Sequence, residues 1–256
     1  YQWLPGTTHR VRVRLRSALG KWGAWYTQAV VFGPTVTLQA NATFDLGLAP
    51  WTSLRTAPNA GTAVAGAPAL NGTRSLLVLA QTGQANGAGN AVGLSGTPNS
   101  WRGSFRFDAS QITVTPANGL ITAGNHPALA TADVAIARLR TSSASTVEVH
   151  YTNALGVRAV RLQASNGSPS GFVALSAGPH VISVVWLGNA TVGAPAGTVS
   201  RRAYLTVDGS ATAAVSVNLP NNVPSPPATL QLGAMSPTLL LSSGSVVRFD
   251  DVLSAR

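Results

Sequence analysis

The carboxylate side chains limit the chemistry that this chain can perform. The 256 residues contain seven acidic side chains. These are Asp45, Asp108, Asp133, Glu148, Asp208, Asp250 and Asp251. Glycoside hydrolysis by paired carboxyl groups needs two of them flanking one bond, yet Glu148 is the only glutamate and has no acidic residue two positions away. The sequence therefore argues against a hydrolase of this kind, and we expect a non-catalytic protein.

The sequence also lacks the common motifs for nucleophilic catalysis and for metal binding. Four histidines are present, at positions 9, 126, 150 and 180. None lies in a His-x-His or His-Glu-x-x-His spacing, and no Gly-x-Ser-x-Gly motif occurs. The chain has no cysteine, which excludes disulfides, thiolate zinc sites and cysteine nucleophiles. His180 follows a turn, and we expect it to serve packing or hydrogen bonding.

A ladder of arginines is the best candidate for binding a polyanion. Arg10, Arg12, Arg14 and Arg16 alternate with apolar residues, and such alternation predicts a strand with one basic face. The alternative is that this ladder is simply the solvated outer face of a strand. The net charge is +10, but the other arginines are scattered, which argues against nucleic acid as a partner.

The composition suits an extracellular or cell-surface protein, and we expect a bacterial one. Only 9% of the residues are charged, against about 25% in an average globular domain. The surface must then be built from small and polar uncharged residues, as in a secreted or assembled protein. No apolar run approaches the roughly 20 residues of a membrane-spanning helix, so we expect no membrane span.

Short alternating segments follow one another along the chain and predict an all-β antiparallel sandwich. They are separated by turn signals at intervals of about ten residues, and none has helical periodicity. The expected strands include 101–108, 134–140, 146–151, 157–162, 180–186, 203–207, 229–233 and 245–252. Asp208-Gly209 directly after one of them predicts a hairpin turn.

Residues 44–256 resemble laminin-G-like and concanavalin A-like jelly rolls. The resemblance rests on the order of four motifs in the second half of the chain and one at its start. They are Gly178-Pro179-His180, Val207-Asp208-Gly209, Leu230-Gln231-Leu232-Gly233, Phe249-Asp250-Asp251 and Phe44-Asp45-Leu46-Gly47-Leu48. It implies a jelly-roll β-sandwich.

The jelly-roll resemblance also implies a structural calcium ion shared by the first and last strands. Asp45, Asp250 and Asp251 occupy the matching positions. Calcium takes about six to eight oxygen ligands, so backbone carbonyls would have to supply most of them. The alternative is that Asp250 and Asp251 cap a strand end and pair with Arg248 or Arg256.

Residues 1–33 resemble the last strands of a fibronectin type III domain. The matching pieces are a Leu4-Pro5-Gly6-Thr7 turn, the arginine strand, Trp22-Gly23-Ala24-Trp25 and Val30-Val31-Phe32. His9 stands where that family usually has tyrosine. We expect a boundary at Gly33-Pro34, a linker over 34–43, and partner strands for the first unit from upstream or from a neighbouring subunit.

The aromatic residues offer no obvious platform for stacking on sugars. The pattern predicts that Trp51, Trp101 and Trp186 lie in the core. The sequence therefore favours an extracellular structural or adhesive module of a cell-surface, sheath or filament protein, with other copies of itself as partners. The alternative is a carbohydrate-binding module of a secreted multidomain enzyme, with cell-surface glycans as partners.

Overall fold

The computed structural model divides the chain into two units, Tyr1–Thr37 and Leu38–Arg256. It describes residues 8–18, 20–31, 38–42, 44, 51–55, 61–65, 70, 74–80, 88–94, 100–111, 133–141, 146–153, 157–165, 167–188, 201–210, 212–219, 227–235 and 245–255. All regular elements within these ranges are β-strands, and all their pairings are antiparallel. The expected all-β class is therefore confirmed, and no helix in the described ranges could cross a membrane.

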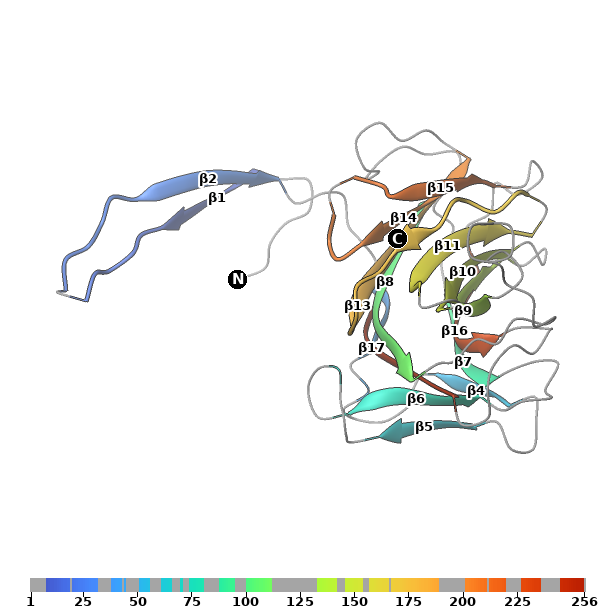
Figure 1. Ribbon diagram of the computed structural model, residues 1–256. Coiled ribbons are helices and arrows are strands. Elements are labelled where there is room, and N and C mark those ends of the chain that lie inside the picture. The colour runs from blue at the N-terminus through green and yellow to red at the C-terminus, as the bar shows by residue number, and fades with distance from the viewer. Residues whose placement is uncertain are drawn as a thin grey trace. The chain divides into compact units, whose positions relative to one another are not determined.

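One layer of the second unit is an eight-stranded sheet (Figure 1). Its strands are paired in the order β15-β14-β13-β8-β17-β6-β5, with β3 pairing β17 as well. The bounds are β3 Leu38–Ala42, β5 Gly61–Ala65, β6 Ser75–Ala80, β8 Ser100–Gln111, β13 His180–Leu187, β14 Arg202–Val207, β15 Val215–Asn218 and β17 Ser245–Ala255. β3 and β17, the first and last strands of this unit within the described residues, thus lie in one sheet.

The other layer is a seven-stranded sheet with the order β12-β11-β10-β9-β16-β7-β4. Its bounds are β4 Thr52–Arg55, β7 Ala88–Gly93, β9 Val134–Arg140, β10 Thr146–Thr152, β11 Ala159–Ala164, β12 Val173–Ala174 and β16 Thr229–Met235. The two layers face each other in Figure 1, with β13, β8 and β17 on one side and β10, β9 and β16 on the other. This is the antiparallel sandwich that the alternating pattern predicts.

The core forms between the two sheets because each strand alternates apolar and polar residues. On β10, Val147, Val149 and Tyr151 are buried, while the residues between them are partly exposed. Trp101 and Trp186 are both buried, as the pattern predicts, and Trp51 is buried as well. Phe107 packs edge-on against Tyr151 across the two layers, with ring centroids 5.7 Å apart.

The missing side chain of Gly103 leaves the space that the Trp101 ring occupies beside β8. A Cβ atom at Gly103 would stand 2.2 Å from Cη2 and 2.3 Å from Cζ2 of Trp101. These distances are far below van der Waals contact, so a larger residue would push the ring out of its place in the core.

The stretch expected to be a linker contains a strand of the sandwich. β3 lies inside 34–43 and pairs with β17, with Ala42 opposite Val252. The linker prediction is therefore wrong for Leu38–Ala42, since these residues form ladder hydrogen bonds with the last strand. The predicted boundary at Gly33-Pro34 falls outside the described residues.

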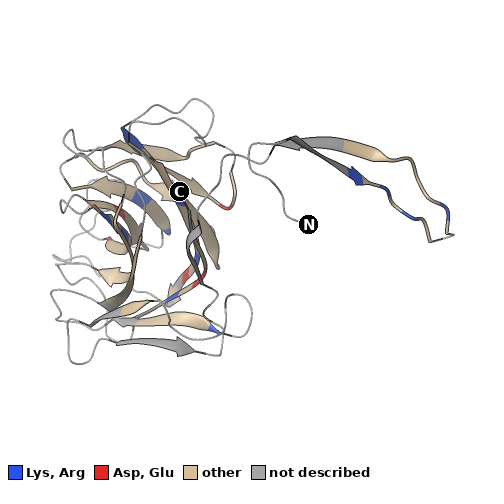
Figure 2. Ribbon diagram, turned by 180° about the vertical axis from the view of Figure 1, so that it is seen from behind, with Lys and Arg blue, Asp and Glu red and all other residues tan. Residues whose placement is uncertain are grey.

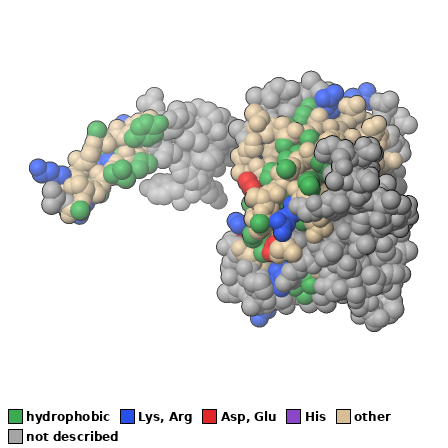
Figure 3. Space-filling model, viewed as in Figure 1, with side chains coloured by type: hydrophobic (Ala, Val, Ile, Leu, Met, Phe, Trp, Pro, Cys, Tyr) green, Lys and Arg blue, Asp and Glu red, His purple; other side chains and the backbone are tan. Residues whose placement is uncertain are grey.

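The first unit contains an antiparallel hairpin of β1 (Thr8–Val13) and β2 (Tyr26–Val31). Hydrophobic and basic side chains are both exposed on it (Figure 3). Leu15 is 80% and Tyr26 66% exposed. These side chains fit the expectation of partner strands, but the fibronectin type III resemblance and the missing strands stay predictions.

Candidate functional site

The outer face of the seven-stranded sheet carries a compact set of polar and charged side chains. On β10 the residues Thr146, Glu148 and His150 alternate with the core residues, so their side chains point away from the other sheet. The strand ladders then place polar residues of three neighbouring strands beside them. Figure 2 shows basic and acidic positions on the strands of the sandwich.

The central row of this face crosses four strands. Gln231 of β16 lies opposite Arg138 of β9, Arg138 opposite Glu148 of β10, and Glu148 opposite Gln163 of β11. We call these four residues the polar row. Neighbouring strands are about 4.8 Å apart, so the polar row extends over roughly 14 Å. All four side chains are partly exposed.

A continuous chain of ion pairs fixes the charged members of this face. Arg138 Nε contacts Glu148 Oε1 at 2.5 Å, and His150 Nε2 lies 2.8 Å from Glu148 Oε2. His150 Nδ1 lies 3.1 Å from Asp133 Oδ1, and Arg161 Nε contacts Asp133 Oδ2 at 2.5 Å. Arg138 and Arg161, at the two ends, are therefore connected through His150.

Burial differs along this chain of ion pairs. The side chains of Asp133 and Arg161 are 8% and 6% exposed, while those of Glu148 and Arg138 are 17% and 29% exposed. Arg161 also packs over the Phe172 ring, with its Cζ atom 5.0 Å from the ring centroid. The buried end thus supports the sheet, and the exposed end can reach a ligand.

The protonation states follow from these contacts. Burial alone would raise the pKa of Glu148, but the His150 hydrogen bond and the Arg138 charge outweigh it and lower that pKa. Burial alone would lower the pKa of His150, but hydrogen bonds to Asp133 and Glu148 outweigh it and raise that pKa. Because both ring nitrogens face carboxylate oxygens, the imidazolium form can donate to both.

The sequence alone did not predict this chain of ion pairs. Glu148 stands apart from other acids in the sequence, whereas the fold places Asp133 on the opposite side of His150. The period-two spacing of Glu148 and His150 was a usable signal, because it puts both on one strand face. Asp133 gave no such signal, since it precedes β9 in a segment without alternation.

A second constellation joins Ser176, His180 and Asp208. His180 Nδ1 lies 2.9 Å from Asp208 Oδ2, and its Nε2 lies 3.5 Å from Ser176 Oγ but 3.1 Å from the Ser176 backbone oxygen. A general base needs a free lone pair on Nε2 directed at the hydroxyl. Here the shorter contact is to a carbonyl oxygen, which only an N–H donor satisfies.

His180 therefore holds two turns together rather than activating a serine. Asp208 also accepts a hydrogen bond from the Val181 N–H at 2.9 Å. Although burial would raise the pKa of Asp208, the hydrogen bonds from His180 and Val181 outweigh this and lower it. The His180 ring is buried beside Phe107, with ring centroids 6.5 Å apart. The expectation of packing and hydrogen bonding is confirmed for this histidine.

The proposed calcium ligands on the last strand lie inside β17, not at a strand end. Asp250 is fully buried, accepts a hydrogen bond from Ser75 Oγ at 3.1 Å, and accepts another from the Asp251 N–H. Asp251 pairs with Arg106 at 3.1 Å. The alternative that these aspartates cap a strand end is wrong, because β17 continues to Ala255.

The surroundings of Asp250 supply some of the oxygen ligands that calcium needs, but not all of them. A buried carboxylate beside a serine hydroxyl supplies the oxygen donors that calcium prefers. Asp45 lies outside the described residues, and the described residues contain no group of three or more metal-ligating side chains. The shared calcium site of Asp45, Asp250 and Asp251 therefore stays a prediction.

The arginine ladder lies on the hairpin of the first unit. The Arg14 guanidinium packs over Trp22 and Trp25, at 4.4 and 4.5 Å from the ring centroids. Arg16 packs over Trp22 at 5.6 Å and donates a hydrogen bond from Nε to the Gly20 oxygen. These contacts give two of the four arginines a packing role. Polyanion binding by Arg10, Arg12, Arg14 and Arg16 stays a prediction.

No protein-family model and no curated protein sequence matches the chain. Among solved structures, the cellulose induced protein Cip1 is similar, with a TM-score of 0.55 and 11% identity over 84% of this chain and 96% of that one. An endo-β-1,4-glucuronan lyase from the fungus Trichoderma reesei has a TM-score of 0.52 and 13% identity, over 86% and 95%. At these identities the likeness establishes the β-sandwich fold.

Proposed function

We propose that the chain is a non-catalytic module of an extracellular or cell-surface protein, and that it binds a polysaccharide on the outer face of its seven-stranded sheet. The observation that carries this proposal is the polar row, whose charged members are held in place by ion pairs. Of the two roles expected from the sequence, glycan binding is the better supported. A structural or adhesive role in a filament or sheath stays a prediction.

The polar row supplies the groups that hydroxyl-rich ligands require. The Gln163 and Gln231 side-chain amides form no hydrogen bond within the described residues, so each offers a donor and an acceptor. Arg138 uses Nε for Glu148 and keeps its other N–H groups for a ligand. Because the ion pair already fixes this guanidinium, less side-chain entropy is lost when a ligand binds.

The charge of this face favours a glycan that carries carboxylates. Three cationic groups (Arg138, His150 and Arg161) face two carboxylates (Asp133 and Glu148). This leaves an excess of one positive charge when the histidine is protonated. Arginine binds carboxylates through two parallel N–H groups. The similar lyase acts on β-1,4-glucuronan, which makes this polyuronate a suitable first probe here.

Two features support binding rather than bond cleavage. Both carboxylate oxygens of Glu148 already face cations, and its pKa is lowered, so it is a weak base. His150 is held between two carboxylates, which stabilise the protonated ring and reduce its tendency to give up a proton. We therefore propose recognition without turnover.

Isothermal titration with soluble β-1,4-glucuronan, xylan and cello-oligosaccharides tests this proposal. We expect binding of at least one of these probes, and a loss of about tenfold or more in Gln231→Ala and Arg138→Gln. Arg102→Gln is the matched control, since Arg102 is exposed on the other sheet. Binding that survives both polar-row substitutions, or cleavage of glucuronan into unsaturated products, would contradict the proposal.

A further inference from the structure

One end of the β1–β2 hairpin is exposed to solvent throughout. All residues in the ranges 12–18 and 21–27 are exposed. They include two large aromatic side chains, since Trp22 is 53% and Trp25 is 55% exposed. Contiguous exposed apolar surface on a protein commonly marks a site of interaction with another molecule. This end of the hairpin is therefore a candidate binding surface, separate from the polar row.

Two arginines and two tryptophans of this hairpin stack on one another. The Arg14 guanidinium lies over both tryptophan rings, and the Arg16 guanidinium lies over Trp22. We call Arg14, Arg16, Trp22 and Trp25 the arginine–tryptophan cluster. A guanidinium that stacks through its flat face keeps the N–H groups in its own plane for hydrogen bonds. Within the described residues, Arg14 forms no hydrogen bond and Arg16 uses only Nε.

The charge of the hairpin is entirely positive. Arg12 and Lys21 lie beside the arginine–tryptophan cluster in the sequence, and residues 1–44 contain no aspartate or glutamate. Figure 2 shows basic positions along the hairpin and no acidic position among its described residues. No carboxylate of the described residues pairs with any cation of this hairpin. The surface is thus complementary in charge to an anionic partner.

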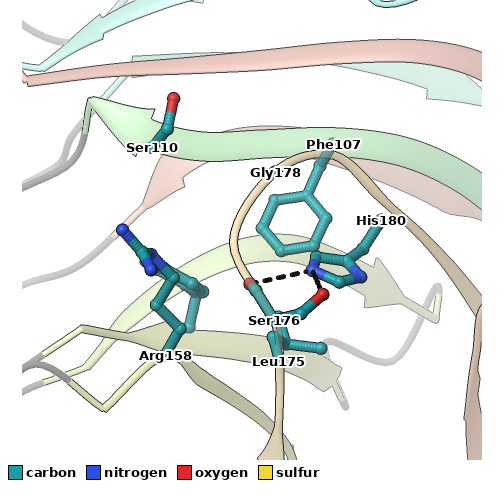
Figure 4. Close-up of a pocket in the computed structure, with 8 residues that line it drawn as sticks. Phe107, Ser110, Arg158, Leu175, Ser176, Gly178 and His180 are labelled. Atoms are coloured by element: carbon teal, nitrogen blue, oxygen red, sulfur yellow. Dashed lines mark hydrogen bonds between the residues drawn. The ribbon is translucent and has the colours of Figure 1, made fainter.

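The second unit differs, because several of its cations have partners within the chain. Arg106, Arg138 and Arg161 each pair with a carboxylate. At the small pocket beside His180, the imidazole ring contacts the Ser176 backbone oxygen, which lies on the neighbouring turn (Figure 4). These contacts stabilise the fold of the second unit. The hairpin cations have no such role, apart from the stacking on tryptophan.

The spacing of the arginines favours a polymer over a small anion. Arg12, Arg14 and Arg16 are two residues apart, so their backbone positions are separated by roughly 7 Å and extend over about 14 Å. Water solvates each of these exposed charges, and one small anion contacts only one or two of them. A polymer with a carboxylate on each repeating unit can contact all three, and the weak contacts then act together.

We propose that the hairpin is a second binding site for a carboxylated polysaccharide, which it recognises through the guanidinium groups of Arg12, Arg14 and Arg16. Their N–H groups donate hydrogen bonds to the carboxylate oxygens. The choice of a glycan rests on the proposed function of the chain. Single-stranded nucleic acid fits less well, because its bases stack on free aromatic faces, and Arg14 already lies over both tryptophan rings.

Titration of soluble β-1,4-glucuronan into the 256-residue chain separates this site from the polar row. In the Arg138→Gln background, replacing both Arg12 and Arg14 with glutamine should lower the remaining affinity by about a further tenfold. Because salt screens exposed charges, this remaining binding should weaken several-fold between about 50 and 200 mM sodium chloride. The matched control is Arg74→Gln with Arg102→Gln, which removes the same charge from exposed positions of the second unit.

Two measurements show whether the glycan binds at the arginine–tryptophan cluster. Arg14→Lys keeps the charge but loses the planar set of N–H donors, so it should not restore the affinity that Arg14→Gln loses. Bound glucuronan should also protect exposed tryptophans from quenching by acrylamide, and the Arg12→Gln, Arg14→Gln variant should lose this protection. Full affinity in Arg14→Lys would overturn the proposed role of the stacked guanidinium.

The outcomes also distinguish the hairpin site from the polar row. An unchanged glucuronan affinity in Arg12→Gln, Arg14→Gln would overturn the hairpin site and leave the proposed function intact, as would xylan binding without any glucuronan binding. Loss of binding in this variant but not in Arg138→Gln would support the hairpin site and contradict the polar row. Tighter binding of an oligonucleotide, an anionic lipid vesicle or a second copy of the chain through the same arginines would overturn the choice of a polysaccharide.

Discussion

Replacing Glu148 with glutamine breaks the ion-pair chain at its centre, and its effect follows from the contacts. The carboxylate contacts Arg138 at 2.5 Å and His150 at 2.8 Å. A hydrogen bond to a charged group contributes roughly 1.5–3 kcal/mol. Arg138 can turn to water when its partner is lost, and the glutamine oxygen still accepts one hydrogen bond. We therefore expect a net destabilisation of about 2 kcal/mol.

The Tm of the Glu148→Gln variant should fall by about 4–8 °C, because 1 kcal/mol corresponds to roughly 2–4 °C in a domain of this size. Circular dichroism or calorimetry at neutral pH measures this shift. Arg106→Gln is the control, since it removes the ion pair with Asp251, whose two side chains are 35% and 28% exposed. Such pairs contribute about 0–1 kcal/mol.

The pH dependence gives a further test of the same reasoning. The pKa of His150 is raised above 6.5, so its stabilisation is complete below pH 6.5 and is lost as the pH rises through the folded-state value. The pKa of Glu148 is lowered below 4.5, so its stabilisation is present above pH 4.5 and is lost as the pH falls through the folded-state value. We expect the network to contribute most between these limits.

In Glu148→Gln, His150 loses one of its two anions, so the loss of stability on the alkaline side should move to lower pH. The reasoning is refuted if Glu148→Gln lowers the Tm no more than Arg106→Gln does and leaves the pH profile of stability unchanged.

Three further predictions concern the core, the metal and catalysis. Gly103→Ala should destabilise the protein by about 1–3 kcal/mol in urea denaturation, because its Cβ would overlap the Trp101 ring. Gly93→Ala, with open space around it, should cost much less. If calcium binds near Asp250, a chelator should lower the Tm and added calcium should restore it, whereas Asp250→Asn should not respond; an identical Tm with and without chelator would exclude the site. Glycan and ester substrates should not be turned over, and an activity that disappears in Glu148→Gln would show that prediction to be wrong.

The sequence predicted the sandwich well because alternation is a local signal. The segments 134–140 and 146–151 were both expected to be strands, and they form β9 and β10, which pair with each other. Asp208 and Gly209 both have positive φ, as a tight turn requires. The stretch after them is longer than a two-residue hairpin, since β15 begins only at Val215. Asp208-Gly209 therefore predicted the turn correctly, but it did not predict how many residues connect β14 to β15.

The candidate site could not be predicted because it depends on pairing register. Gln231 and Gln163 are far apart in the sequence and reach one row only through the β16-β9-β10-β11 ladder. The same applies to Asp133, which pairs with His150 and Arg161 from outside the strand pattern. Sequence reasoning looked for aromatic platforms and paired acids, and it therefore gave little weight to a face built from arginine, glutamine and histidine.

A crystal structure of the chain with a bound oligosaccharide tests the central proposal most directly. We predict that the sugar lies on the outer face of the seven-stranded sheet and that hydrogen bonds connect it to Arg138, Gln163 and Gln231. A sugar bound on the outer face of the eight-stranded sheet, or at the β1–β2 hairpin and nowhere else, would contradict the proposal.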